Sequence, residues 1–153
     1  MDNTEIENYI DSIPSIKAKF SGIYDERSVT SIKNCKKKPA LILYTETSED
    51  TGHWVAMYLD KTSEFYDPLG QAPSKYSQEF ENILIKCSEK YSYSTFPTQG
   101  PKSIYCGMFV LCYLYLRCNG VSYENILSMY TDNFVTNDKI VKTFLLSILN
   151  KNN

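Results

Sequence analysis

Residues 99–116 read Gln-Gly-Pro-Lys-Ser-Ile-Tyr-Cys-Gly-Met-Phe-Val-Leu-Cys-Tyr-Leu-Tyr-Leu, a polar turn followed by an almost wholly apolar segment. Glycine and proline at Gly100-Pro101 interrupt regular structure before that segment begins. From Cys106 to Leu116 the residues are apolar nearly all round, and a helix of this kind lies in the core with other elements on every side. We therefore predict a central buried helix that begins at Cys106.

The segments before this helix predict a short sheet. Three of them are brief and apolar with polar ends, as strands are: Pro39–Thr45, His53–Leu59 and Ser63–Asp67. A tight turn at Asp60–Thr62 joins the last two, and a further extended piece is expected at Tyr93–Phe96.

Helices are expected on both sides of these strands, because apolar residues recur there at helical spacing. The expected ranges are about 4–20, 77–91, 122–130 and 137–149. Thr4 with Glu7 matches a capping box at the first start, and Pro14 should interrupt that helix. Segregated strands and helices predict one α+β domain over residues 1–153, a small mixed sheet packed against the central helix with flanking helices.

Composition excludes several classes of protein. Apolar residues make up 42% of the 153 residues and charged residues 22%, which is typical of a folded domain. The net charge of −2 does not indicate a nucleic-acid-binding protein, and the basic run Lys33–Lys38 is more typical of a solvated loop. No apolar run is long enough to span a membrane, and the acidic, polar start is unlike a secretory signal.

Cysteine and histidine counts argue against a metal site. The chain has one histidine and five cysteines without a CxxC pair, so neither zinc nor a disulfide framework is expected. We predict no metal and no cofactor.

His53 and Cys106 are the candidates for nucleophilic catalysis. A Cys–His mechanism has to use His53, because it is the only histidine. Cys106 lies at the start of the predicted central helix, where the helix dipole lowers a thiol's pKa, and Gly107 leaves room for a substrate backbone. Cys112 and Cys118 lie among bulky residues and indicate core packing instead.

Two further polar residues complete a candidate site. Gln99 lies in a loop bounded by proline and glycine, where a rigid amide can serve as an oxyanion donor. Asp67 ends the strand after His53 and could hold the imidazole in one tautomer, although Asp before proline also commonly opens a turn. A two-residue turn between the strands would put Asp67 and His53 on opposite faces, and a longer turn on the same face. The sequence leaves this open.

Taken together, Gly-His-Trp at residues 52–54, Asp-Pro-Leu-Gly at 67–70, and Gln-Gly-Pro with Cys-Gly-Met-Phe at 99–109 resemble the adenovirus-type cysteine endopeptidases. This family, the adenains, has relatives in polinton-like elements and virophages, and the likeness extends more distantly to the ubiquitin-like-modifier proteases. The resemblance implies a papain-like architecture with Cys106 as nucleophile, His53 as base, Asp67 behind it and Gln99 as oxyanion donor. It also implies that Trp54 lines the substrate groove. Gly107, which leaves room for a substrate backbone, is the second residue expected there.

The family resemblance sets expectations for function and partners. The main one is a cysteine endopeptidase of viral or mobile-element origin that cleaves capsid precursors at Gly-containing sites, located in the virion or where it assembles and not secreted. The alternative is a protease that cleaves ubiquitin-like modifiers after Gly-Gly.

The adenovirus enzymes bind an activating peptide through a disulfide, for which Cys87 is a candidate without clear alignment. The chain is shorter than the adenovirus enzyme, and the missing part falls after the nucleophile helix, so no function of that family's C-terminal region is carried over.

Overall fold

The computed structural model describes residues 1–33, 36–46 and 52–152. A five-stranded mixed sheet lies at its centre, with strand order β1-β2-β3-β4-β5. The strands are β1 (Phe20–Tyr24), β2 (Ala40–Thr45), β3 (His53–Tyr58), β4 (Ser63–Tyr66) and β5 (Tyr91–Tyr93). β2, β3 and β4 are antiparallel, whereas β1 and β5 add to the edges in parallel. The predicted α+β class with a small mixed sheet is confirmed.

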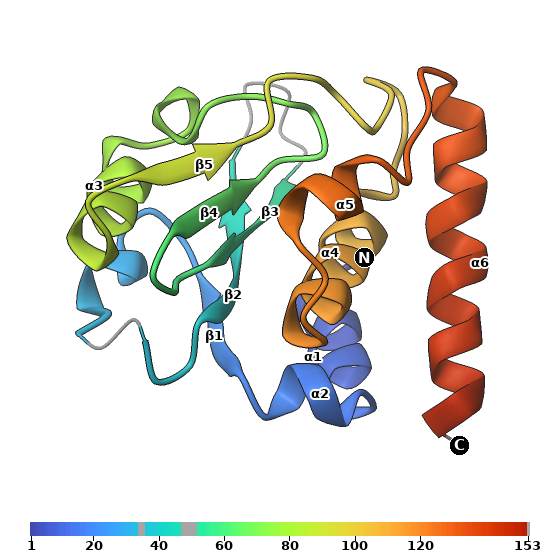
Figure 1. Cartoon of the computed structure of the whole chain (residues 1–153), viewed down its shortest axis with the longest axis horizontal. Coiled ribbons are helices and arrows are strands. Elements are labelled where there is room, and N and C mark those ends of the chain that lie inside the picture. Colours follow the sequence, from blue (N-terminus) through green and yellow to red (C-terminus); the bar gives the residue numbers. More distant parts are fainter. Residues whose placement is uncertain (34–35, 47–51, 153) are drawn as a thin grey trace.

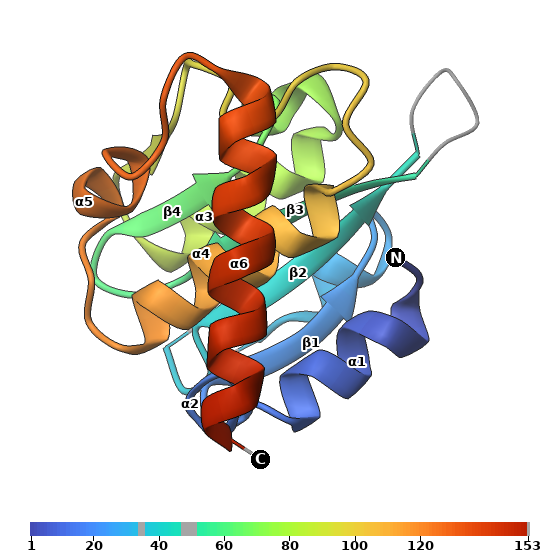
Figure 2. The ribbon, with the colours of Figure 1, turned by 90° about the vertical axis from the view of Figure 1, so that its right-hand side faces the viewer.

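Helices cover both faces of the sheet (Figure 1). One face carries α3 (Gln78–Cys87), and the other carries the central helix α4 (Cys106–Cys118) together with α1 (Asn3–Asp11) and α2 (Pro14–Lys17). The remaining helices are α5 (Tyr123–Leu127) and α6 (Phe134–Asn152), and two short 3-10 turns span Ser28–Ser31 and Pro73–Lys75. α6 lies across α4 on the side away from the sheet (Figure 2).

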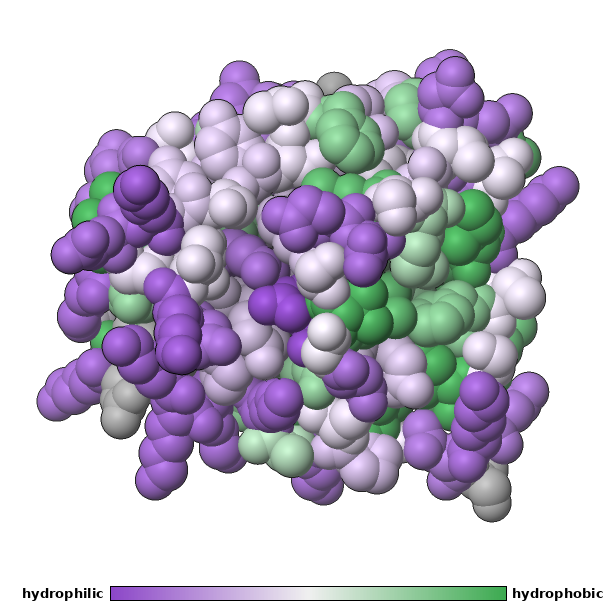
Figure 3. All heavy atoms as spheres, in the orientation of Figure 1, coloured by the Kyte–Doolittle hydropathy of each residue, from purple (hydrophilic) through white to green (hydrophobic). Residues whose placement is uncertain are grey.

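The central helix is buried as its composition requires. Apolar side chains of α4, including Phe109, Leu111 and Leu114, are fully buried between β3 and α6. β3 is buried along its whole length, because α4 covers one face and α3 the other. Figure 3 shows how hydropathy is distributed over the surface: polar side chains cover the α3 side, and apolar side chains gather around α5 and α6. The predicted start of the central helix at Cys106 is confirmed.

Several predicted boundaries are wrong. The capping box at the first helix is formed by Asp2 and Glu5, not by Thr4 and Glu7. Helix α1 ends at Asp11, and Pro14 begins a separate short helix because its fixed φ suits a first helical position. Residues 20–24 form an edge strand that the helical pattern did not predict, and β5 begins before the expected extended piece.

Cys87 is disulfide-bonded in the structure, whereas Cys106, Cys112 and Cys118 are free thiols. The cysteine spacing did not lead us to expect this bond. A covalent activator at Cys87 would therefore have to exchange with an existing disulfide.

Within the described ranges, no helix is both long and apolar enough to cross a membrane.

Candidate active site

The hairpin of β3 and β4 places His53 and Asp67 on the same face of the sheet. His53 is the first residue of β3, and Asp67 directly follows β4. Tyr58 pairs with Glu64, so the hairpin turns over residues 60–62, one residue more than a two-residue turn. Because side chains alternate between the two faces of a strand, this longer turn directs both side chains to one side.

The imidazole and the carboxylate are in direct contact. His53 Nε2 lies 2.7 Å from Asp67 Oδ1, and both residues are buried. Three more donors surround the carboxylate: the N–H of Leu69 at 2.9 Å, the N–H of Gln71 at 3.1 Å and the Tyr76 hydroxyl at 2.7 Å. The Tyr76 ring also tilts against the imidazole at a centroid distance of 5.8 Å. These contacts fix the carboxylate and, through it, the orientation of the imidazole.

Cys106 completes this arrangement from the amino end of α4. The His53 side chain and the backbone N–H groups of Trp54 and Gly107 all favour the ionised form of the Cys106 thiol. Asp67 engages Nε2 of the imidazole, which leaves Nδ1 to face the thiol. The predicted residues His53, Asp67 and Cys106 are therefore brought together.

Each member of the Cys–His pair changes the protonation of the other. Burial raises the pKa of the Cys106 thiol, but the hydrogen bond from His53, the Trp54 N–H and the imidazolium charge outweigh it, so the pKa is lowered. Burial lowers the pKa of His53, yet its hydrogen bonds with Asp67 and Cys106 raise it to about 9. The positive end of the α4 dipole acts in the same direction on the thiol. Both shifts favour a thiolate–imidazolium pair, the reactive form of such a nucleophile.

The loop that carries Gln99 is fastened to the turn that carries Asp67. The N–H groups of Thr98 and Gln99 both donate to the Pro68 carbonyl, at 2.8 and 2.9 Å. Gly70 has a φ of +72°, and a Cβ there would lie 2.6 Å from the backbone of Phe96. The two loops are thus in backbone contact.

The Gln99 side chain is buried within this loop. Its Nε2 donates to the Ser103 carbonyl at 2.7 Å, while its Oε1 is buried without a hydrogen-bond partner among the described residues. An amide nitrogen has two hydrogens. Since Ser103 takes one, the other remains for a second acceptor, such as a developing oxyanion.

Trp54 and Gly107, the predicted groove residues, are both covered by Met1. The Trp54 indole N–H donates to the Met1 carbonyl at 2.9 Å, and Tyr44 packs edge-on against the indole with ring centroids 5.0 Å apart. A Cβ on Gly107 would lie 2.7 Å from Met1 Sδ. Met1 therefore lies against both residues that the sequence predicts to line the substrate groove.

Three solved structures share this architecture at low sequence identity. ChlaDub1 from Chlamydia trachomatis gives a TM-score of 0.60 at 13% identity, with 97% of this chain and 91% of that chain covered. The ASFV pS273R protease gives 0.51 at 16%, covering 90% and 64%. The C-terminal Ulp1 protease domain in complex with Smt3, the yeast ortholog of SUMO, gives 0.50 at 13%, covering 97% and 78%. The fold is that of the Ulp1-like cysteine proteases.

Comparisons by sequence add nothing to this. No protein-family model matches the chain, and no curated protein matches it. The expected likeness to the adenovirus-type endopeptidases is therefore supported only at the coarser level of the Ulp1-like fold.

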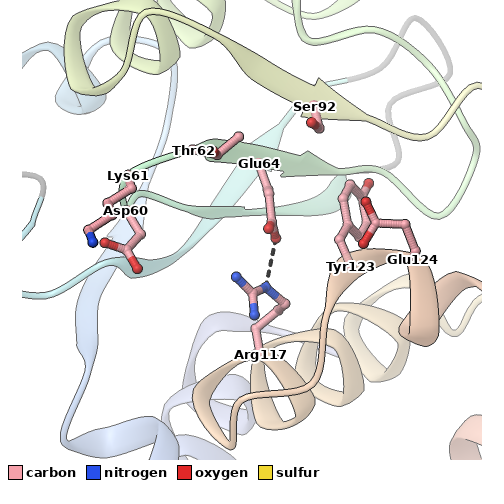
Figure 4. Close-up of a pocket in the computed structure, with 8 residues that line it drawn as sticks. All are labelled: Asp60, Lys61, Thr62, Glu64, Ser92, Arg117, Tyr123 and Glu124. Carbon is pink, nitrogen blue, oxygen red and sulfur yellow. Dashed lines mark hydrogen bonds and ion pairs between the residues drawn. The ribbon is translucent and has the colours of Figure 1, made fainter.

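This structure also contains a hollow of about 350 Å³ beside the C-terminal end of α4, the opposite end from Cys106 (Figure 4). Arg117 and Glu64 line it, and Arg117 Nε lies 2.8 Å from Glu64 Oε2, which also accepts from the buried Tyr113 hydroxyl at 2.8 Å. Arg117 also donates to the Val121 carbonyl and stacks over the Tyr58 ring. These contacts tie α4 to β4 and lie apart from the site.

Nothing in the described parts of the chain provides a metal site. No group of three or more His, Cys, Asp or Glu side chains there could hold an ion. The basic run at 33–38 falls partly on residues 34–35, which lie outside the described ranges.

Tyr76 and Met1 are the site residues that the sequence analysis missed. Tyr76 lies outside every predicted element, and its contact with Asp67 arises only when the turn after β4 folds back. Met1 reaches the site because α1 packs against α4. No local sequence pattern marks either residue.

Proposed function

We propose that this protein is a cysteine protease that releases a ubiquitin-like modifier by cleaving after its terminal Gly-Gly. The main support for hydrolysis is the buried 2.7 Å contact between His53 and Asp67, together with the effect of the imidazole on Cys106, whose pKa it lowers. A cysteine with a lowered pKa beside an oriented histidine is the signature of an activated nucleophile.

The residues then act in sequence. The Cys106 thiolate attacks the scissile carbonyl carbon, and the oxygen takes the negative charge beside the Gln99 amide and the Cys106 backbone N–H. The C–N bond breaks as the His53 imidazolium gives its proton to the leaving amine, which leaves a thioester on Cys106. His53 then takes a proton from water, the resulting hydroxide attacks the thioester, and the acid product leaves with the thiolate restored.

The lack of space over Gly107 supports Gly-Gly specificity. Met1 accepts a hydrogen bond from the Trp54 indole, and its Sδ lies 2.7 Å from the position that a Cβ on Gly107 would take. Residues without side chains pass such a constriction most easily. In this proposal the substrate tail displaces Met1. The likeness to Ulp1, which was solved with Smt3, supports a folded modifier as the substrate.

Maturation of viral structural precursors is the second candidate. The likeness to the ASFV pS273R protease favours it, although this chain covers 64% of that protein against 78% of the Ulp1 domain. This candidate uses the same residues on short Gly-containing segments.

Fluorogenic conjugates distinguish the two candidates. The full chain is incubated with SUMO and ubiquitin carrying a C-terminal fluorophore amide, and with a short Gly-Gly peptide carrying the same fluorophore. We expect release from a folded modifier to exceed release from the peptide, with the Cys106→Ala variant as the blank.

Two results would contradict the proposal in different ways. Equal, Cys106-dependent cleavage of peptide and modifiers would contradict the substrate assignment and favour maturation of precursors. An absence of any hydrolysis, together with Cys106 alkylation that follows an ordinary thiol, would contradict the protease assignment itself.

A further inference from the structure

We infer that the beginning of α6 positions the oxyanion donor Gln99, with Asp138 and Asn137 as positioning residues. This inference rests on the proposed hydrolysis at Cys106, and it assigns a role to the C-terminal region of the chain.

A chain of hydrogen bonds links Asp138 to the Gln99 amide. The Ser103 hydroxyl donates to Asp138 Oδ1 at 2.9 Å, and the Ser103 carbonyl accepts from Gln99 Nε2 at 2.7 Å. The Ser103 hydroxyl oxygen also accepts the N–H of Tyr105 at 3.3 Å, directly before Cys106. Asp138 therefore holds the residue that connects the two donors of the oxyanion site, the Gln99 side chain and the amino end of α4.

Asn137 holds the other end of the same loop. It is fully buried, and its Nδ2 donates to the carbonyls of Thr98 and Thr131 at 2.8 Å each. Its Oδ1 accepts the N–H of Thr131 at 2.8 Å. All the strong hydrogen-bonding groups of this amide are used, so its position is strongly determined.

A third contact lies between these two. A Cβ on Gly100 would lie 3.1 Å from Phe134 Cβ, so the loop backbone rests directly on the first residue of α6. Three positions of the loop therefore each contact a residue in the first turn and a half of α6: Thr98, Gly100 and Ser103. Neither Asp138 nor Asn137 hydrogen-bonds to the side chain of His53, Asp67 or Cys106.

This arrangement has a specific functional consequence. An oxyanion donor acts only when its N–H is aimed in advance at the position where charge develops. Without Asp138, the Ser103 side chain loses its hydrogen bond to α6, and only the turn bond to Gly100 holds the Ser103 backbone, so the Gln99 amide is less firmly oriented. Attack on a carbonyl should then slow down, while the nucleophilicity of the Cys106 thiolate should not change.

The test compares two reactions of the same thiol in Asp138→Ala and in the unmodified chain. Formation of a hemithioacetal with a Gly-Gly peptide aldehyde places a negative oxygen in the oxyanion site, whereas alkylation by iodoacetamide does not. We expect Asp138→Ala to weaken aldehyde inhibition and lower kcat on the fluorogenic substrate by about 10- to 100-fold, below the loss for removing a donor outright. KM and the alkylation rate should stay within about twofold of the unmodified chain.

Three further variants complete the test. Asp138→Asn keeps an acceptor for Ser103 and should recover most of the activity, and Ser103→Ala should resemble Asp138→Ala. Lys139→Ala, the exposed neighbour on α6, should have no effect. Unchanged aldehyde inhibition in Asp138→Ala, or a parallel fall in alkylation, would overturn the inference while the unmodified chain remains active. An inactive, ordinarily alkylated Cys106 in the unmodified chain would overturn the proposed function as well.

Discussion

At the scale of single residues, Cys106 and His53 control each other's ionisation. The thiolate exists above the lowered pKa of Cys106, and the imidazolium that stabilises it exists below the His53 pKa of about 9. The pair is therefore lost on the acid side when the thiolate gains a proton, and on the alkaline side when the imidazolium loses one. Asp67 widens this interval because it raises the His53 pKa.

Alkylation of Cys106 against pH measures this interval. We expect reactivity with iodoacetamide to rise well below the free-thiol pKa of about 8.5, and to move up to about that value in His53→Ala. Mass spectrometry assigns the modified cysteine, with buried Cys112 and Cys118 as internal references that should not react. The same curve in both proteins would show that the pair is not formed.

Local sequence context was sufficient to select His53, Gln99 and Cys106 as candidates, because each lies at the boundary of a strongly patterned segment. Whether the Asp67 side chain lies on the same sheet face as His53 depends on the length of one turn, which the pattern of apolar residues does not determine. Asn137 lies 39 residues from Thr98, the residue whose carbonyl it binds. A contact of that kind depends on the packing of α6 and has no signature in either segment.

At the scale of elements, the strands and helices with strong apolar periodicity were predicted well and the edges poorly. β1 was missed because all five of its residues are half-buried, which leaves neither an alternating nor a continuous apolar pattern. The start of α1 was misplaced because Asp2 with Glu5 and Thr4 with Glu7 fit the same capping rule, and only the folded backbone distinguishes them.

Gly70 lies where the loop that follows Asp67 packs against the loop that carries Gln99, and Gly70→Ala should disturb both loops. The substitution puts a side chain at φ +72° and a Cβ 2.6 Å from the Phe96 backbone, so the strain of a left-handed conformation adds to a clash. We expect a loss of more than about 2 kcal/mol in urea unfolding, with slower substrate turnover.

Gly120→Ala is the matched control for Gly70→Ala. Gly120 has a φ of +86°, but nothing lies within 4 Å of a Cβ placed there. In Gly120→Ala the free energy of unfolding should therefore fall only by the conformational cost, about 1 kcal/mol, and substrate turnover should be unchanged. Equal effects of the two substitutions would contradict the close approach of the two loops.

Glu64 connects β4 with the far end of α4, and Glu64→Ala tests that connection. The substitution leaves the Tyr113 hydroxyl and the Arg117 guanidinium without their shared acceptor. We expect the free energy of unfolding to fall by about 2–4 kcal/mol, while Cys106 alkylation stays unchanged in the folded protein.

The control for this variant is Glu124→Ala, an exposed residue that lines the same hollow (Figure 4). Its effect should lie within about 0.5 kcal/mol of zero. A loss for Glu64→Ala no larger than that of the control would mean that the network contributes little to stability.

At the scale of the whole molecule, α6 is an integral layer and not an appendage. It buries Val141, Leu145 and Ile148 against α4, and its carbonyl at Val141 lies 3.6 Å from the Cys112 sulfur. Burial of three such side chains contributes about 5–9 kcal/mol, which is comparable with the whole stability of a typical domain.

Removal of residues 131–153 should therefore unfold the protein and expose Cys112. We expect Cys112 to be unreactive toward iodoacetamide in the full chain and to be alkylated within minutes in the shortened one, with loss of the near-ultraviolet circular dichroism. A shortened chain that still protects Cys112 would show that the sheet and α4 fold without their outer layer.

The position of Cys106 also determines how the protein responds to oxidants. A thiolate attacks an oxygen of hydrogen peroxide and expels hydroxide, so Cys106 should form a sulfenic acid while the neutral, buried Cys112 and Cys118 stay reduced. Cys112 follows six residues later on the same helix, about 9 Å along its axis, which is too far to capture that sulfenic acid as a disulfide. With no neighbouring thiol on α4 to resolve it, recovery should depend on a small thiol such as glutathione entering the groove, and prolonged exposure should drive Cys106 to the irreversible sulfinic state.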